Sequence, residues 1–180
     1  MPDVQAVGRA GAVSIAAPEL FEFLRIASQA YPEFNREMRI AAEEVAQVVV
    51  DRAKVNAAGQ PKHGPTVRGS SGMSQAQAVV NGLRARRDRI PTIKLDHKRG
   101  FVSASRPNRK RKTKVTMGDV FFGAEFGGRK PGNKTQQFLR HRGRQGYFFW
   151  QAVRDNKSYI AKAYSEKIDL VLKKLAAGAG

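Results

Sequence analysis

The sequence contains no cysteine, which excludes disulfide bonds, thiolate zinc sites, iron–sulfur clusters and cysteine nucleophiles. It also lacks any apolar run approaching the roughly 18 residues that a membrane helix needs. The N-terminus has no basic stretch followed by an apolar one, so a secretory signal is not indicated. We therefore expect no membrane partner and no export, and stability must come from packing or assembly.

Acidic residues are scarce, with 15 Asp and Glu against 33 Lys and Arg in 180 residues, for a formal net charge of +18. Residues 84–144 hold 19 of these cations and four acids, so one third of the chain carries +15. Charge this dense repels itself and attracts polyanions. Two interpretations stay open. The basic region is either a solvated face or disordered loop, or it binds a polyanionic partner, and we favour the polyanionic partner.

The length suits one domain, and 41% hydrophobic residues are enough to build a core. We expect a single domain over residues 1–180 that begins with an N-terminal arm over 1–17. Two basic, Gly-rich or Pro-containing stretches have few apolar anchors, and the sequence predicts that they form extended basic loops at 106–114 and 127–146.

Apolar residues recur at helical spacing in three places. Pro18 followed by acidic residues predicts a first helix over 18–30, and a closing amphipathic helix is predicted over 152–176. Between them, a stripe at alternating spacings of four and three predicts a long helix over 32–57, with one residue, Arg52, out of place. The stripe consists of Phe34, Met38, Ala41, Val45, Val48, Arg52 and Val55.

Shorter elements are predicted between the long helices. Ser74 is a suitable cap for a short helix that carries Leu83 and ends near the arginines that follow it. Alternation of apolar and polar residues predicts two short strands at 90–94 and 101–105, joined as a hairpin. Residues 115–126 are typical of a strand that runs into one helical turn.

Four consecutive aromatic residues, Tyr147 to Trp150, form the densest aromatic patch in the chain. They cannot all face one side of a helix or strand. Burial in the chain's own core, contact with another subunit and stacking against bases all remain open for them.

Motifs for catalysis are absent or broken. The three histidines have no second ligand at metal-binding spacing, and the phosphate-loop-like run at 127–135 is interrupted by Asn133. Asp119 and Glu125 lie among cations, which gives no reason for a raised pKa. We expect no enzyme, metal or cofactor, and an enzyme acting on phosphorylated substrates stays only as a remote reading.

Three motifs are distinctive: FFGAEFGG at 121–128, QFLR at 137–140 and GYFFWQAV at 146–153, followed by an amphipathic helix. Together they resemble the tail-completion or head–tail joining (neck) proteins of long-tailed bacteriophages, of the minor tail protein Z type. The chain departs from that pattern at His141, where the family has proline. The basic arm at 106–114 is also longer and more basic than the pattern requires.

The resemblance implies an α+β fold, in which a small antiparallel sheet packs with two long amphipathic helices. It implies a six-fold homo-oligomeric ring in the virion neck, assembled in the host cytoplasm, between the head connector and the tail tube through which DNA passes. Other connector and tail proteins would be partners. Glu125, Phe126 and Gly127 would form a tight turn that depends on the glycine.

The candidate site residues fall into two sets. Basic residues of the loops would contact DNA in the channel, through nonspecific phosphate contacts, or an acidic partner: Arg106, Arg109, Lys110, Arg111, Lys112, Lys114, Arg129, Lys130 and Lys134. Residues of the motifs would form the subunit interface: Glu125, Phe126, Gly127, Phe138, Leu139, Phe148, Phe149 and Trp150. The alternative function is a nonspecific cytoplasmic nucleic-acid-binding protein, which would read backbone and not bases.

Overall fold

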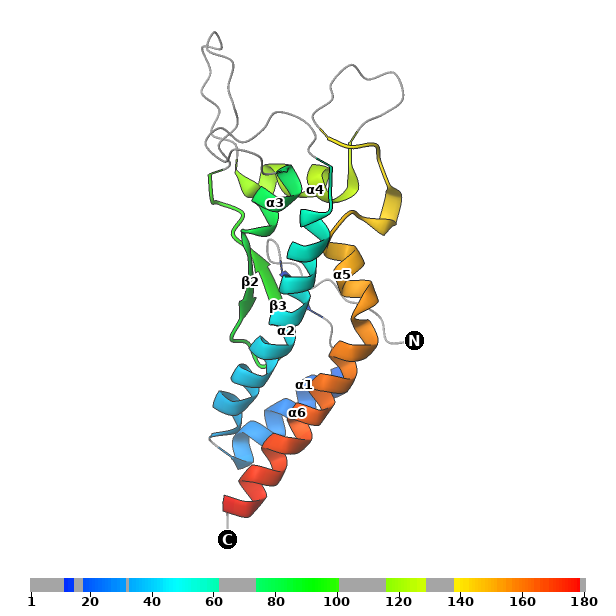
Figure 1. Ribbon diagram of the computed structural model, residues 1–180. Helices are drawn as coiled ribbons and strands as arrows, with labels where there is room; N and C mark the ends of the chain where they lie inside the picture. The colour runs from blue at the N-terminus through cyan, green and yellow to red at the C-terminus, as the bar shows by residue number, and fades with distance from the viewer. Residues whose placement is uncertain are drawn as a thin grey trace. The chain divides into compact units, whose positions relative to one another are not determined.

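The computed structural model describes residues 12–14, 18–31, 33–61, 74–100, 116–128 and 138–178 (Figure 1). The described chain is mostly helical with a small antiparallel sheet, which confirms the predicted α+β class. The helices are α1 (Pro18–Ala30), α2 (Phe34–Ala58), α3 (Gln75–Val80), α4 (Met117–Phe126), the 3-10 helix η1 (Gly143–Gln145), α5 (Phe149–Asp155) and α6 (Lys157–Gly178). The strands are β1 (Ala12–Ser14), β2 (Leu83–Arg86) and β3 (Thr92–Leu95).

The chain divides into two compact units, and the boundary between them falls within α2 and between α5 and α6. The first unit comprises Met1–Val48, Arg84–Lys94 and Asn156–Gly180, and the second comprises Val49–Leu83 and Leu95–Asp155. Each unit is described by itself, and the single domain over 1–180 stays a prediction.

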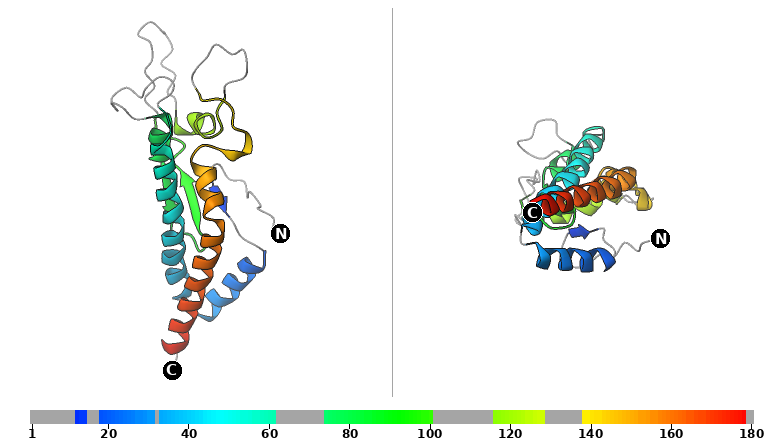
Figure 2. Two further views of the ribbon diagram at one scale, coloured as in Figure 1. Left: turned by 45° about the vertical axis from the view of Figure 1, so that its right-hand side comes forward. Right: turned by 90° about the horizontal axis from the view of Figure 1, so that it is seen from below.

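In the first unit, α1, the first part of α2 and α6 share one apolar core (Figure 2). The helix predicted over 18–30 is confirmed as α1. Burial of aliphatic and aromatic surface is the main stabilising contribution here. The core cluster consists of Leu24, Ala27, Phe34, Met38, Ala42, Val45, Ile90, Tyr164 and Val171.

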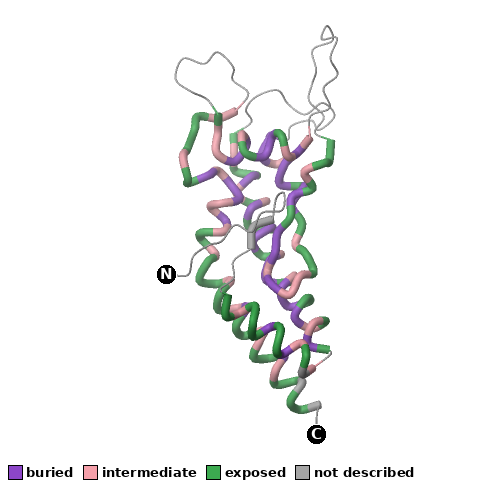
Figure 3. The backbone as a smooth tube through the Cα atoms, turned by 180° about the vertical axis from the view of Figure 1, so that it is seen from behind, coloured by how far each residue is buried: buried purple, intermediate pink, exposed green. Residues whose placement is uncertain are grey.

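The predicted apolar stripe of α2 is correct at its start and wrong toward its end (Figure 3). A repeat that averages 3.5 residues drifts around a helix of 3.6 residues per turn, so the stripe turns away from the core along three heptads. Val48 is 37% and Val55 62% exposed, and Arg52 is exposed as a normal surface residue. Alanines and valines take over the buried face: Ala46, Val49, Val50, Ala53 and Ala57.

The strand order in the sheet is β1-β3-β2, and β1 runs antiparallel to β3 with Val13 opposite Ile93. Only five residues separate β2 from β3, too few for a parallel crossover, so these strands form a hairpin. The strand predicted at 90–94 is therefore confirmed in outline as β3. Its predicted partner was wrong, because β3 pairs with β2, and residues 101–105 lie outside the described residues.

The short helix predicted from Ser74 ends earlier than expected. Ser74 caps α3 as predicted, with its Oγ accepting the Gln77 N–H, but the helix stops at Val80. Gly82 follows, where a Cβ would lie 2.5 Å from the Met117 sulfur and 3.2 Å from the Val79 carbonyl oxygen, so glycine allows a close approach at this point. Leu83, predicted to be helical, therefore begins β2.

The closing helix predicted over 152–176 is two helices, α5 and α6, interrupted at Asn156. Tyr164 and Val171 of α6 are buried as its apolar stripe predicts. Among the described helices, none combines the length and apolar character that crossing a bilayer would need.

Candidate functional site

The first part of the site is α4, where the sequence predicted mainly a strand. Thr116 and Asp119 form a reciprocal cap: the Thr116 Oγ accepts the Asp119 N–H, and the Asp119 carboxylate accepts the Thr116 N–H at 2.9 Å. Hydrogen bonds from the Thr116 backbone and hydroxyl lower the pKa of Asp119. This cap starts a helix of 10 residues, which explains why the strand prediction for 115–126 was wrong.

Glu125 lies on the inner face of α4, and its side chain is fully buried. Its carboxylate accepts hydrogen bonds from the backbone N–H groups of Phe148 (3.2 Å), Phe149 (2.9 Å) and Trp150 (2.9 Å). These groups lie at the start of α5, where a helix cannot satisfy its own N–H donors. A carboxylate from one helix therefore caps another helix that follows some 20 residues later.

The side chains of Asn56, in α2, and Gln60, just after α2, donate hydrogen bonds to backbone carbonyls of the same segment. The Asn56 amide donates to the Phe148 carbonyl at 3.1 Å, and the Gln60 amide donates to the Tyr147 carbonyl at 3.0 Å. The N–H groups of 148–150 and the carbonyls of 147 and 148 are thus satisfied by side chains from α4, from α2 and from Gln60 just after α2, as buried polar groups require.

Gly127 ends α4 in a backbone conformation that side chains rarely adopt, with φ of +75°. A Cβ there would overlap the Arg140 carbonyl oxygen and lie 2.6 Å from the Leu139 carbonyl oxygen. The Phe126 carbonyl accepts the Arg142 N–H at 2.9 Å. The resemblance implied a tight turn at 125–127. At Gly127 the chain does turn in a conformation that depends on glycine, but Glu125 and Phe126 are the last residues of α4.

Two more glycines make close contacts possible. Gly146, with φ of +65°, faces the Glu125 carboxylate, so that a Cβ at this position would overlap the Oε1 atom. Gly123 lies against the Phe138 ring, where a Cβ would be 2.5 Å from the ring carbons. We call the contacts among 123–128, 138–142 and 146–150, together with Asn56 and Gln60, the motif node.

The aromatic residues of the node, together with the neighbouring Phe121 and Phe122 of α4, divide into a buried and an exposed group. The Phe121 ring packs edge-to-face on Phe148 and Phe149, with centroids 6.1 and 5.9 Å apart, and all three side chains are buried. Phe122 is 67% exposed, and its ring stacks on Phe126 at 6.3 Å. Of the interpretations for the aromatic run, core packing is confirmed for Phe148 and Phe149.

Burial raises the pKa of Glu125, although the hydrogen bonds from the α5 backbone oppose this shift. The expectation that no carboxylate of this region has a raised pKa was wrong, because burial removes water from the Glu125 carboxylate and this effect outweighs its hydrogen bonds. A charged carboxylate in such a site is tolerated because several N–H donors replace its water.

The raised pKa predicts how stability depends on pH. Between the ordinary value near 4.5 and the raised value, the folded protein binds a proton more readily than the unfolded chain. The free energy of unfolding should therefore fall as the pH rises through this window. Urea unfolding measures the free energy of unfolding of wild type and of Glu125→Gln from about pH 4 to about pH 8. The difference between the two values at each pH gives the contribution of Glu125. A wild-type advantage that grows with rising pH would contradict the prediction.

The motif node contains every residue that the sequence proposed for the subunit interface: Glu125, Phe126, Gly127, Phe138, Leu139, Phe148, Phe149 and Trp150. Glu125, Phe148 and Phe149 are buried within the chain and belong to its own core. The nine cations proposed for DNA or an acidic partner lie outside the described residues: Arg106, Arg109, Lys110, Arg111, Lys112, Lys114, Arg129, Lys130 and Lys134.

Sequence reasoning missed Asn56 and Gln60. Their spacing of four residues, with both amides at the end of the long helix, was the only signal for a shared role. It also treated 127–146 as one loose arm, whereas 138–146 is held by backbone hydrogen bonds and contains η1.

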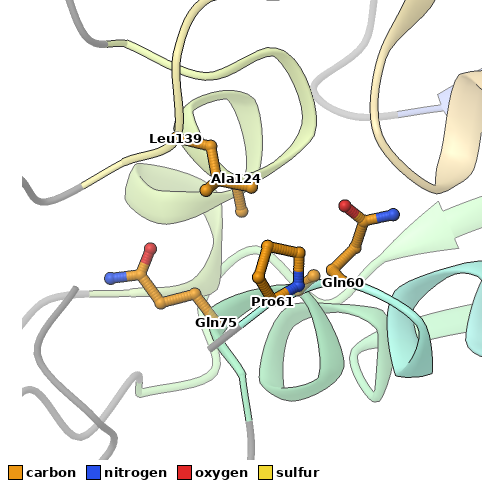
Figure 4. A pocket seen from close by; sticks show the side chains of 6 residues that line it. Gln60, Pro61, Gln75, Ala124 and Leu139 are labelled. Atoms are coloured by element: carbon orange, nitrogen blue, oxygen red, sulfur yellow. The ribbon is translucent and has the colours of Figure 1, made fainter. Parts of the chain in front are cut away.

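A small pocket beside the node gives no room for an organic ligand (Figure 4). The space open to the centre of a water molecule is about 20 Å³, enough for about one water. Gln60, Pro61, Gln75, Ala76, Ala124 and Leu139 line it.

Within the described ranges, no three His, Asp or Glu side chains come together as metal ligands. Asp119 and Glu125 are both occupied as helix caps. No family model, curated protein or solved structure matches this chain.

Proposed function

We propose that this chain is a non-enzymatic structural component of a bacteriophage neck, which forms a ring between the head connector and the tail tube. The observation that carries the proposal is the motif node. Three sequence motifs carry the resemblance to neck proteins, and residues of all three meet around Glu125 and Gly127.

The chemistry of the node supports a structural role for these motifs. Their polar groups hold backbone, since the Glu125 carboxylate accepts three N–H groups and the Tyr147 hydroxyl donates to the Arg140 carbonyl at 2.7 Å. A catalytic carboxylate needs access to a substrate, whereas Glu125 is fully buried. Motif residues that hold the backbone in one conformation also determine the shape of the protein surface around them, as a role in assembly requires.

Exposed apolar side chains support assembly into a ring. Phe122 protrudes from the node helix α4 with 67% exposure, and α1 carries Phe21 and Ile26 at 46% and 54%. Large exposed aromatic and aliphatic residues are enriched where proteins contact one another.

Substitution of Phe122 by Asp is expected to weaken self-association at least about 10-fold, because a charge would have to be desolvated in an apolar contact. Sedimentation velocity of the purified chain measures this as a shift toward the 19.9 kDa monomer. Ser165→Asp adds the same charge at an exposed site on α6 and is the control. Equal association of the Phe122 variant and the control would remove Phe122 from the interface.

Cryo-electron microscopy and mass spectrometry of purified virions test the proposed function directly. We expect the chain in the particle, as a ring of density between the connector and the tail tube. Absence of the chain from the particle, or its presence only inside the capsid, would refute the proposal.

A nonspecific cytoplasmic nucleic-acid-binding protein is the second candidate. It is favoured by exposed arginines at 140, 142 and 144, none of which forms an ion pair with a described residue. This candidate predicts salt-sensitive binding to free duplex and no place in the virion.

A further inference from the structure

The segment 140–144, with the sequence RHRGR, has its backbone held at several points (yellow to gold in Figure 1). The Arg142 N–H donates to the Phe126 carbonyl at 2.9 Å, and the Arg140 carbonyl accepts the Tyr147 hydroxyl at 2.7 Å. Arg154 of α5 donates its guanidinium to the Arg144 carbonyl at 2.9 Å and also to the Gln145 carbonyl. The backbone of the segment is therefore held in one conformation, although most of its residues belong to no helix or strand.

The side chains of the same segment are exposed, and three of them belong to arginines. Arg140, His141, Arg142 and Arg144 are all exposed, and no acidic residue occurs between Glu125 and Asp155. By contrast, Arg87 of the other basic stretch that the structure describes pairs with Glu43 at 2.7 Å. Among the described residues, the three arginines of 140–144 have no acidic partner, so their charge is available for a partner outside the chain.

The chemistry of the segment fits phosphate. Guanidinium groups bind phosphate oxygens with two parallel N–H donors, which makes arginine the preferred side chain for this contact. Gly143 brings no side chain to the surface, and a Cβ there would meet no atom within 4 Å, so a ligand can approach the backbone.

Duplex DNA suits the segment better than a single strand does. Stacking on single-stranded bases needs a free aromatic face. Of the aromatic rings that flank the segment, Phe138 packs against Gly123, and the Arg142 guanidinium lies over Tyr147 at 5.2 Å from its ring centroid. The segment therefore offers charge and hydrogen-bond donors without a stacking surface.

We propose that residues 140–144 form a preorganised contact site for the phosphates of double-stranded DNA. This inference rests on the proposed function, because it names the contact by which a ring subunit would hold the DNA that passes through it. Fixing the backbone in advance lowers the entropy that binding must remove, so the arginines bind more tightly than on a flexible loop.

Fluorescence anisotropy with a short labelled DNA duplex, measured over a salt series, tests the proposal on the full chain. The triple variant Arg140→Gln, Arg142→Gln, Arg144→Gln removes three positive charges from the site. We expect the slope of log affinity against log salt to fall by about 2.7, which is about 0.9 for each lost phosphate contact.

The matched control removes three exposed cations elsewhere, by Arg39→Gln, Lys157→Gln and Lys173→Gln. Its slope should change by less than about 1, since general attraction alone is weakened. An equal loss in both variants would overturn the proposal, because a diffuse field would then explain binding. Unchanged binding by the triple variant would overturn it as well.

Two further measurements separate the alternatives. Tyr147→Phe keeps every arginine and frees the Arg140 carbonyl, so affinity should fall about 2- to 5-fold at an unchanged salt slope. No fall would contradict preorganisation. If the triple variant lost affinity for polyglutamate but kept its affinity for duplex DNA, an acidic protein would be the partner and the proposal would be wrong.

Circular dichroism and thermal unfolding show whether the triple variant is folded. If it is not, Arg140→Gln and Arg144→Gln are tested singly, because neither side chain forms a hydrogen bond with a described residue, and each should lower the slope by about 0.9. The outcome is independent of the virion experiment. If the triple variant lost DNA binding but the chain were absent from the virion, the neck function alone would be refuted. If the chain formed a ring in the neck but the triple variant bound DNA as well as wild type does, this contact alone would be refuted.

Discussion

Replacement of Gly127 by alanine is expected to lower the free energy of unfolding by about 4 kcal/mol. The φ of +75° and ψ of 168° belong to a region that only glycine adopts readily, at a cost of about 1–3 kcal/mol for other residues. The new Cβ would also overlap the carbonyl oxygens of Leu139 and Arg140. Backbone that must shift to relieve such overlap adds about 1–3 kcal/mol.

Gly143→Ala is the matched control, because Gly143 also has a positive φ, of +61°, but a Cβ there would meet no atom within 4 Å. It should lose only the conformational contribution, about 1–2 kcal/mol. Urea unfolding followed by the fluorescence of Trp150, the one tryptophan of the chain, measures both variants. Equal losses would show that contact with 139–140 does not constrain Gly127.

Glu125→Ala is expected to destabilise the protein by about 3–5 kcal/mol. The substitution leaves the N–H groups of Phe148, Phe149 and Trp150 without their acceptor in a buried site. Each orphaned donor costs about 1–3 kcal/mol, and part of this loss is offset because a buried charge is removed. The loss should appear as a lower urea midpoint.

Two variants identify the source of that loss. Glu125→Gln keeps the volume and one acceptor oxygen, so it should be less destabilising than the alanine variant. Asp119→Asn alters the exposed cap at the other end of α4 and should have the smallest effect of the three. If Glu125→Gln were as stable as wild type, the charged hydrogen bonds to α5 would contribute nothing.

The positions of the long helices could be predicted closely from the sequence, because helix formation depends on residues three and four apart, whereas α4 was expected mainly as a strand. Pro18 begins α1 where expected, and the stripe from Phe34 to Val45 identifies the buried face of α2. The prediction failed at Val48 and Val55 because a 3.5-residue repeat, followed over three heptads, leaves the buried face of a straight helix.

Strand pairing could not be predicted to the same degree. The alternation at 90–94 indicated β3, but nothing local specified that Leu83–Arg86 would be its neighbour. That choice depends on where α3 ends, and α3 ends where Gly82 passes the Met117 sulfur. Contacts between residues distant in sequence leave no periodic signal.

The motifs were recognisable in the sequence, but the roles of their residues were not. Glu125 was expected in a turn at a subunit interface, and the structure shows a buried cap for α5. Its partners are backbone N–H groups, which every residue except proline possesses, so no side-chain pattern marks them. The same holds for Asn56 and Gln60, which donate to carbonyls of 147–148.

The sequence by itself determined the long helices and the excess of positive charge, because composition and short-range spacing specify these, whereas the α+β class was implied by the resemblance of its motifs to a family. The tertiary structure alone decided which carboxylate is buried, which aromatic side chains stay exposed and which arginines keep their charge free. These properties depend on the neighbours that folding brings from distant parts of the chain, and burial and pairing exist only once those neighbours are in contact.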